Sequence, residues 1–329
     1  MPRAAVIGVG NMGQHHARVY ADLEDVDLVA VADTNETQLR RVAKHYRARG
    51  YADYHEMLDK EKIDLLTIAL PTYAHKEAAL AVFDRKIDVL LEKPIAGNST
   101  EAAEIIATAA RSGSKLIVGH IERFNPAVIA LKEKISQGAL GDIYKIEVIR
   151  IGPFPGHVGD VGVSTDLAVH DIDIIEYVLH KQVTKVYANF QKKVHPTHED
   201  MLTAMLHYQD GIVCNMSISW LSPIKVRQIS FLGEKGLFRV NYLYQGLFFY
   251  ENSVHKNGGF IPSLMLGSEG NMTKFHIEKK EPLRSELEHF INYHLDKEAP
   301  VITGEEALKS LKIVEYMKES ADRDEIVRL

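Results

Sequence analysis

Short apolar runs and longer amphipathic stretches alternate along the first 120 residues. The runs are rich in β-branched residues and predict buried strands, and the amphipathic stretches predict helices. This alternation indicates right-handed βαβ units, with helices on both faces of a parallel sheet. Asn98 and Ser99 can cap the fourth helix, and Gly113 can end it. The expected strands are Ala4–Val9, Leu28–Ala32, Ile63–Leu70, Val89–Leu91 and Lys115–Gly119, and the expected helices are Met12–Asp22, Glu36–Arg47, His75–Arg85 and Thr100–Ser112.

The pattern changes after residue 120. Several strand-like segments follow one another, and turn signals at Gln209–Gly211 and Gly233–Gly236 predict hairpins. Helices are expected at about Pro126–Gln137, Asp166–Leu179, Pro282–Asp296 and Glu305–Ser320, and a strand at Ile143–Ile151. The pattern is typical of an α+β domain with a mostly antiparallel sheet. We therefore expect two domains, 1–120 and 121–329, with the active cleft where they meet.

Three glycines, Gly8, Gly10 and Gly13, lie between the first expected strand and the first expected helix. Gly8 permits a tight turn, Gly10 lets the backbone approach a pyrophosphate, and Gly13 lets the helix lie close to the strand. Asp33 ends the second apolar run, twenty positions after Gly13. Its carboxylate can accept ribose hydroxyls and would repel a 2′-phosphate. Glycines also mark ordinary turns, but the strand, the helix and the acid together favour a Rossmann domain that binds NAD.

Lys93 follows an expected strand at its carboxyl end, where ligands bind in open α/β sheets. Beside a bound nicotinamide, a lysine there can hold a substrate hydroxyl. The alternative is a solvated loop lysine, although Pro94 restricts the backbone after it.

Asp166 and His170 are four residues apart, so on a helix they share one face, and Asp173 falls on the same side. The apolar residues between them predict a largely buried helix. A buried histidine flanked by carboxylates can act as a general base near neutral pH. A structural helix whose polar residues cap and pair is an equally good interpretation of the spacing.

Composition excludes several classes of function. The chain of 329 residues has a formal net charge of −6, whereas nucleic-acid binders usually carry a basic excess. No apolar stretch reaches the length of a membrane span, and the first strand begins too early to leave room for a signal peptide. The single cysteine, Cys214, lies in an apolar run and suits a reducing compartment. We expect a cytoplasmic protein with neither a nucleic-acid nor a membrane partner.

The histidines do not predict a metal site. His195, His198 and Glu199 lack the regular spacing and the further ligands of a zinc site. His15 and His16 are interpreted as helix-surface or interdomain residues. We therefore expect no bound metal.

Four motifs stand in order along the chain: GVGNMG at 8–13, PTYAH at 71–75, EKP at 92–94, and Asp166 with His170. Together they resemble the Gfo/Idh/MocA family of NAD(P)-dependent sugar and polyol oxidoreductases, over essentially the whole chain. The resemblance implies that Lys93 and His170 form the catalytic pair and that Asp166 is a substrate or supporting carboxylate. It also implies a homodimer or homotetramer, because the open face of the second domain's sheet often forms the oligomer interface. The cofactor contacts that it implies are Gly8, Gly10, Asn11, Met12, Gly13, Asp33, Pro71, Thr72, His75, Glu92 and Lys93.

A finer resemblance concerns the substrate. Residues 119–128, 151–155, 160–174 and 220–227 resemble members that oxidise the 3-hydroxyl of UDP-N-acetylglucosamine. Such a substrate needs cations or backbone donors for its diphosphate, and the candidates are Arg123, Asn125, Lys225 and Arg227. The alternatives are a solvated strand face for the last two and a helix cap for the first two. The Gly- and Pro-rich loop 152–162 can wrap a substrate or simply connect two elements.

These observations predict an NAD-dependent dehydrogenase of a sugar secondary alcohol, with UDP-N-acetylglucosamine or a related nucleotide sugar as the substrate. Within the same class, the alternative is a dehydrogenase of a free polyol such as inositol. Outside it, the alternative is a regulator that senses NAD without chemistry, although such a protein has no need of Lys93, Asp166 and His170.

Overall fold

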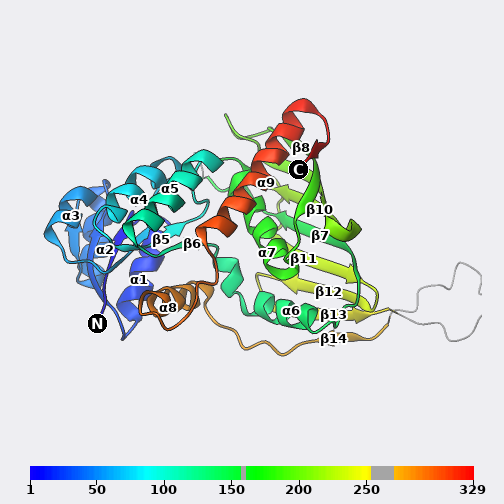
Figure 1. Ribbon diagram of the computed structural model, residues 1–329, viewed down its shortest axis with the longest axis horizontal. Coiled ribbons are helices and arrows are strands. Elements are labelled where there is room, and N and C mark those ends of the chain that lie inside the picture. The colour runs from blue at the N-terminus through cyan, green and yellow to red at the C-terminus, as the bar shows by residue number, and fades with distance from the viewer. Residues whose placement is uncertain (157–160, 253–269) are drawn as a thin grey trace, which may run out of the picture. The chain divides into compact units, whose positions relative to one another are not determined.

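The computed structural model describes residues 1–156, 161–252 and 270–329, and the chain divides into two compact units (Figure 1). The first unit contains Met1–Phe124 and Glu281–Lys312. The second contains most of residues 125–280 together with Ile313–Leu329. Each unit has its own core of buried apolar side chains.

A parallel sheet forms the centre of the first unit. Within residues 1–124, all of which the structure describes, six strands lie in the order β3-β2-β1-β4-β5-β6 and every neighbouring pair is parallel. The α/β prediction for this half is confirmed. The strands are β1 (Arg3–Ile7), β2 (Asp27–Ala32), β3 (Arg49–Tyr51), β4 (Leu65–Ile68), β5 (Asp88–Glu92) and β6 (Leu116–Gly119), and the helices among them are α1 (Gly13–Asp22), α2 (Glu36–Tyr46), α3 (Tyr54–Lys60), α4 (His75–Phe83) and α5 (Ser99–Ser112).

The ends of α5 follow the sequence prediction. The side chain of Asn98 accepts a hydrogen bond from the backbone N–H of Glu101, and Gly113 ends the helix in the left-handed region. The sequence did not predict β3 and α3. Both are short, and β3 has little buried surface, so neither produces a clear apolar period.

Helix α8 (Pro282–His294) belongs to the first unit although it follows the second unit in sequence. Its buried side chains Leu283, Leu287 and Phe290 join the core of the first unit. The Nζ of Lys115, at the start of β6, donates to the carbonyl oxygens of Tyr293 and His294 at 2.6 and 3.0 Å. The predicted domain boundary at residue 120 does not anticipate that α8 packs on the first unit. The amphipathic pattern of a helix shows that one of its faces is buried, but not which core that face joins.

The second unit is built on a large sheet. Its described strands lie in the order β14-β13-β12-β11-β7-β10-β9-β8-β15, and among them only β7 and β10 pair in parallel. The predicted mostly antiparallel sheet is confirmed, as are the hairpins β9–β10 and β11–β12. The strands are β7 (Ile143–Ile151), β8 (Val183–Gln191), β9 (Met201–Tyr208), β10 (Val213–Ser219), β11 (Val226–Gly233), β12 (Gly236–Asn241), β13 (Gly246–Glu251), β14 (Met272–Lys274) and β15 (Val327–Arg328).

One face of this sheet is covered by helices (Figure 1). They are α6 (Pro126–Ser136), α7 (Val169–Leu179) and the second half of α9 (Gly304–Arg323). The strands alternate accordingly: in β7, Ile146 and Val148 are buried under the helices, whereas Ile149 is 40% exposed on the other face. Cys214 is buried in β10, and its thiol is free.

Candidate active site

The glycine loop between β1 and α1 has the geometry that the sequence predicts. Gly8 has a φ of +82°, and a Cβ there would lie 2.5 Å from the carbonyl oxygen of Ala69. A Cβ on Gly13 would lie 1.7 Å from the carbonyl oxygen of Gly8. By contrast, nothing lies within 4 Å of a Cβ position on Gly10. The loop therefore needs glycine at 8 and 13 for its own packing, and it leaves open space at Gly10 for a pyrophosphate.

Asp33 follows β2 and is tied to this loop. Its carboxylate accepts hydrogen bonds from the backbone N–H groups of Val9 and Asn35, both at 2.7 Å. The side chain of Gln38, on α2, donates to the carbonyl oxygen of Val9 at 2.9 Å. A carboxylate has about four lone-pair sites, so Asp33 retains acceptors for ribose hydroxyls. The loop and Asp33 thus fit a dinucleotide.

Glu92 ends β5 and holds the backbone of Lys93. One of its oxygens accepts from the Lys93 N–H at 3.1 Å, and the other lies 2.8 Å from Nε2 of His16. Burial alone would raise the pKa of Glu92. The hydrogen bond and charge of His16, with the charge and N–H of Lys93, nevertheless hold this pKa below its ordinary value. The interpretation of His16 as a surface residue is wrong, since its side chain is 0% exposed.

His75 joins two of the cofactor loops. Its Nδ1 lies 2.9 Å from the carbonyl oxygen of Pro94, and its Nε2 lies 2.9 Å from that of Leu70. Burial lowers the pKa of His75, although these backbone contacts oppose the shift. A neutral imidazole has one N–H, so it donates to one of the two carbonyls at a time. His75 thereby links the loop after β4, which contains Pro71 and Thr72, to the loop after β5.

All predicted cofactor residues lie at one edge of the parallel sheet. The strands β2, β1, β4 and β5 are neighbours, and each is followed directly by one of the segments described above. The carboxyl ends of parallel strands meet at the same edge, which is where ligands bind in open α/β sheets. Residues 8–13, Asp33, Pro71 to His75, and Glu92 with Lys93 are thereby brought together.

Asp166 and His170 belong to the second unit. The predicted helix is confirmed in extent, but its first turn, Ser164–Ala168, is π-helical and continues into α7. Turns of this kind often occur at functional sites. Glu199 accepts a hydrogen bond from the Ser164 N–H at 3.1 Å and another from the Ser164 hydroxyl. The turn that contains Asp166 is therefore anchored at its start.

The candidate substrate residues differ in their surroundings. Arg123 is 2% exposed, and its guanidinium donates to the carbonyl oxygen of Val301 at 2.7 Å and pairs with Glu306 at 3.2 Å. Asn125 is also buried, and its side chain caps α6 by accepting from the N–H of Ala127. These contacts account for the burial of both residues, and their role in substrate binding stays a prediction.

Lys225 and Arg227 lie together where β11 begins. Lys225 is exposed and Arg227 is partly buried. The charge of Arg227, and to a smaller extent burial, lowers the pKa of Lys225. Of the Gly- and Pro-rich loop before the π-helical turn, residues 157–160 lie outside the described part of the chain.

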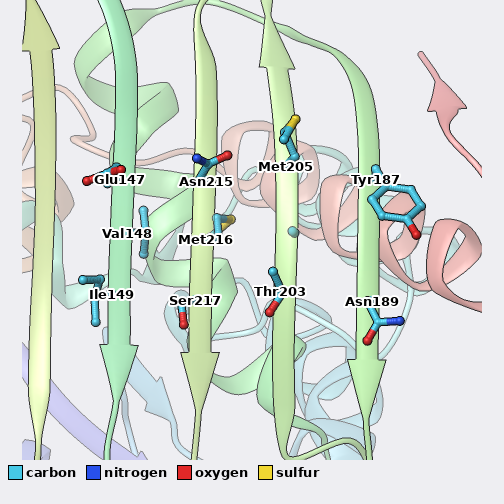
Figure 2. A pocket seen from close by; sticks show the side chains of 11 residues that line it. Glu147, Val148, Ile149, Tyr187, Asn189, Thr203, Met205, Asn215, Met216 and Ser217 are labelled. Carbon is cyan, nitrogen blue, oxygen red and sulfur yellow. The ribbon is translucent and has the colours of Figure 1, made fainter.

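The uncovered face of the large sheet contains a hollow of about 500 Å³. Figure 2 shows Ile149, Asn215, Met205 and Tyr187 on the neighbouring strands β7, β10, β9 and β8, with helices behind the sheet. Ile149, Met205 and Tyr187 are each about 40% exposed. The face is thus a broad apolar surface with polar side chains interspersed.

Among the described residues, no group of three or more His, Cys, Asp or Glu side chains is arranged to hold a metal ion. Nδ1 of His195 instead accepts from the backbone N–H groups of Thr197 and His198. In the same part of the chain, no helix has the length and apolar character needed to cross a membrane.

Comparisons with known proteins cover both units. The oxidoreductase family Gfo/Idh/MocA matches residues 2–120 through its NAD-binding Rossmann fold and residues 132–329 through its C-terminal alpha/beta domain. UDP-N-acetylglucosamine 3-dehydrogenase of Acidithiobacillus ferrooxidans is 28% identical over 290 residues, which is 88% of each chain. Myo-inositol 2-dehydrogenase of Thermotoga maritima is 23% identical over 99% of this chain and 98% of that protein. A solved structure of the Acidithiobacillus enzyme, GnnA, matches with a TM-score of 0.85 at 25% identity, covering 98% of each chain.

Proposed function

This chain belongs to the Gfo/Idh/MocA family of oxidoreductases, and from that premise we propose its substrate and the roles of its residues. Members similar to it are named as dehydrogenases of sugars and polyols, and its first unit is an NAD-binding Rossmann domain. It is a sugar or polyol oxidoreductase that uses NAD. We propose that it oxidises the 3-hydroxyl of UDP-N-acetylglucosamine, or of a related nucleotide sugar, to the ketone.

The proposed mechanism assigns one task to each of three residues. NAD, held by the glycine loop and Asp33, would supply the acceptor for the hydride of the carbinol carbon. His170 takes the proton of the hydroxyl, acting as the general base. The Lys93 ammonium donates a hydrogen bond to the same oxygen and stabilises the charge that develops on it. Asp166 orients His170 or a neighbouring substrate hydroxyl.

The observation that carries the proposal is the anchoring of Lys93. A buried carboxylate, Glu92, holds its backbone, and His75 ties the following residue to the neighbouring cofactor loop. A solvated loop lysine needs neither contact. Lys225 and Arg227 support a nucleotide sugar, since adjacent cations suit a diphosphate.

The decisive experiment measures NADH formation with four substrates: UDP-N-acetylglucosamine, its uronic acid, UDP-glucose and myo-inositol. We expect turnover on an N-acetylglucosamine nucleotide and little on free inositol. Turnover on inositol alone would transfer the assignment to free polyols. Absence of turnover on all four, with NAD still bound, would contradict the enzyme assignment and favour an NAD-sensing regulator.

The free-polyol alternative has its own support. The inositol dehydrogenase of Thermotoga maritima aligns over nearly the full length of both chains. A free polyol has no diphosphate, so Lys225→Ala would leave its turnover unchanged. The same variant would raise KM for a nucleotide sugar, by roughly tenfold or more for the loss of one charge-assisted hydrogen bond.

We also propose that the uncovered sheet face joins copies of this chain in a homodimer or homotetramer. Its apolar side chains favour burial, and a flat sheet face suits a self-complementary interface. We expect Ile149→Asp with Met205→Glu to lower the mass measured by light scattering to that of a monomer. Ile129→Asp is the control, because Ile129 is a similarly exposed apolar residue on α6, which packs on the opposite face. An unchanged mass in the double variant would contradict this interface.

A further inference from the structure

Arg150 interrupts the apolar face of β7. Residues 146, 148 and 150 point to the helix-covered face of the sheet, and the first two are Ile and Val. The third is an arginine whose side chain is 1% exposed. A charge at such a position requires a partner, because an unpaired buried charge is very costly.

The partner of Arg150 is Asp171 on α7. Nε of Arg150 lies 2.5 Å from one carboxylate oxygen of Asp171, and a terminal guanidinium nitrogen lies 3.0 Å from the other. The side chain of Asp171 is 0% exposed. Two parallel N–H···O bonds fix both the distance and the orientation of the pair.

A third contact fixes the guanidinium itself. Its central carbon lies 4.9 Å from the centre of the Tyr242 ring, which is buried. Strand β7 is also paired on both sides, with β10 and β11. Arg150 is thus a rigid point on the sheet, and Asp171 links α7 to that point.

Asp171 is the residue directly after His170, and the turn before it holds Asp166. This stretch is fixed twice: Glu199 anchors Ser164 ahead of Asp166, and Arg150 anchors Asp171 behind His170. A Cβ on Gly162 would lie 2.2 Å from the carboxylate of Glu199, so the first anchor also requires a glycine nearby. Between the two anchors lie the two residues that the proposed function uses.

Stability alone does not explain the buried pair. Two apolar side chains of similar volume usually serve folding as well as a buried ion pair or better, because removing both charges from water is expensive. An apolar pair lacks the fixed geometry of the two parallel hydrogen bonds between a guanidinium and a carboxylate. We propose that Arg150 is a positioning residue that acts through Asp171 to set the placement of His170, an inference that rests on the proposed function of His170.

The test compares three variants with a control. Arg150→Lys keeps the positive charge but loses the bidentate contact, since an ammonium cannot bind a carboxylate through two parallel hydrogen bonds in a fixed plane. The double variant Arg150→Met/Asp171→Leu removes both charges. Asp171→Asn leaves the guanidinium without its counter-charge. Val186→Ala, a core substitution in β8 of the same unit, controls for general destabilisation.

We expect Arg150→Lys and the double variant to lower kcat by roughly 100-fold, the scale of a misplacement of about 1 Å. KM and NAD affinity should change little in both. The double variant should unfold close to the wild-type urea midpoint, whereas Asp171→Asn should unfold well below it. Val186→Ala should lose stability and keep its kcat. A double variant with both wild-type stability and wild-type kcat would overturn the positioning role and leave the pair purely structural.

A crystal structure of the double variant, or of Arg150→Lys if the double variant does not fold, separates this inference from the proposed function. We expect His170 to move relative to β7 by more than about 0.5 Å, the tolerance of a working site. A His170 that stays in place would overturn the inference whatever the activity. If the wild type turns over none of the four substrates, the proposed function fails, and the displacement alone still decides whether Arg150 positions His170.

Discussion

In the first unit the predicted cofactor loops are held by carboxylates that accept from backbone N–H groups, whereas in the second unit one of the two anchors of the His170 segment joins two side chains. Gly8 and Gly13 allow close backbone approach, and Asp33 and Glu92 accept from backbone N–H groups. In the second unit, Arg150 binds Asp171 through side chains alone. The loops depend on glycines and on carboxylates that accept from backbone N–H groups, while the Arg150–Asp171 contact depends on the side chains of both partners.

The largest effect is expected at the lysine. Lys93→Met should lower turnover by roughly 100- to 1,000-fold, the loss found when one donor to a developing oxyanion is removed. NAD affinity should stay near normal, because the backbone bond from residue 93 to Glu92 is kept. Steady-state kinetics and an NAD titration measure the two effects. Lys62→Met, an exposed lysine of the same unit, is the control, and full activity in Lys93→Met would contradict the catalytic assignment.

Asp33→Ala tests the carboxylate that holds the glycine loop of the first unit. It removes the acceptor for the N–H groups of Val9 and Asn35 and the proposed contact with the ribose. NAD affinity should fall by roughly 10- to 100-fold, since hydrogen bonds to a charged group contribute about 1.5–3 kcal/mol. The preference for NAD over NADP should narrow because the repelling charge is gone. An NAD affinity that does not move would refute the ribose role.

Two glycine variants separate packing from cofactor binding. Gly13→Ala places a Cβ against the carbonyl oxygen of Gly8 and should destabilise the protein by about 1–3 kcal/mol, as overpacking does. Gly10→Ala meets nothing within 4 Å, so its stability should change by less than about 0.5 kcal/mol. Both should weaken NAD binding. Urea unfolding without NAD checks the difference, and equal destabilisation by the two variants would contradict this account of the loop.

Glu286, on α8, contrasts with Asp171. Both are fully buried, but neither carboxylate oxygen of Glu286 has a hydrogen-bond partner among the described residues. Burial, and then the charge of Glu92, raise the pKa of Glu286 well above its ordinary value. The folded state therefore holds a proton that the unfolded state releases. The contribution of Glu286 to stability is present below the ordinary glutamate pKa and is lost as the pH rises toward the folded value.

Glu286→Leu should remove this pH dependence. We expect a gain of about 1–3 kcal/mol at neutral pH, the cost of an unsatisfied buried polar group, and a smaller gain at pH 5. Urea unfolding at the two pH values checks the sign. Glu288→Gln is the control: Glu288 is exposed and pairs with Arg284 at 2.9 Å, so its loss should change stability little. A Leu variant that is less stable at neutral pH would mean that Glu286 has a partner in solution.

The sequence located the predicted cofactor residues at the ends of the parallel strands because their signals are local. Gly8, Asp33 and Lys93 each follow a strand directly, and Gly13 begins the helix after the first strand, so a short pattern of glycines, apolar runs and charges locates them. The pairing of His16 with Glu92 could not be predicted, because the two residues are 76 positions apart and meet only when the sheet forms.

The segment that contains Asp166 and His170 shows more clearly what the sequence could not predict. The four-residue spacing of Asp166 and His170 predicted the helix but not its π-helical first turn or its anchors. One signal was present in the sequence: Arg150 stands in the inward register of β7, where the alternation predicts an apolar residue. Glu286 is a similar case, because it shares the apolar stripe of Leu283, Leu287 and Phe290. A charged residue at a position where the alternation of apolar residues predicts a buried side chain therefore indicates one of two things. Either it has a buried partner of opposite charge, or its pKa is shifted so that it is neutral.

The return of α8 to the first unit has a consequence for synthesis and for engineering. The chain is made from its N-terminus, so the cofactor-binding unit lacks Leu283, Leu287 and Phe290 until the second unit's sheet strands up to residue 274 have been synthesised. A fragment cut after residue 124 would leave the matching apolar surface in water. A hybrid that exchanges the cofactor half with that of another protein must therefore transfer residues 281–312 as well, although the second unit separates them from the rest of that half in the sequence.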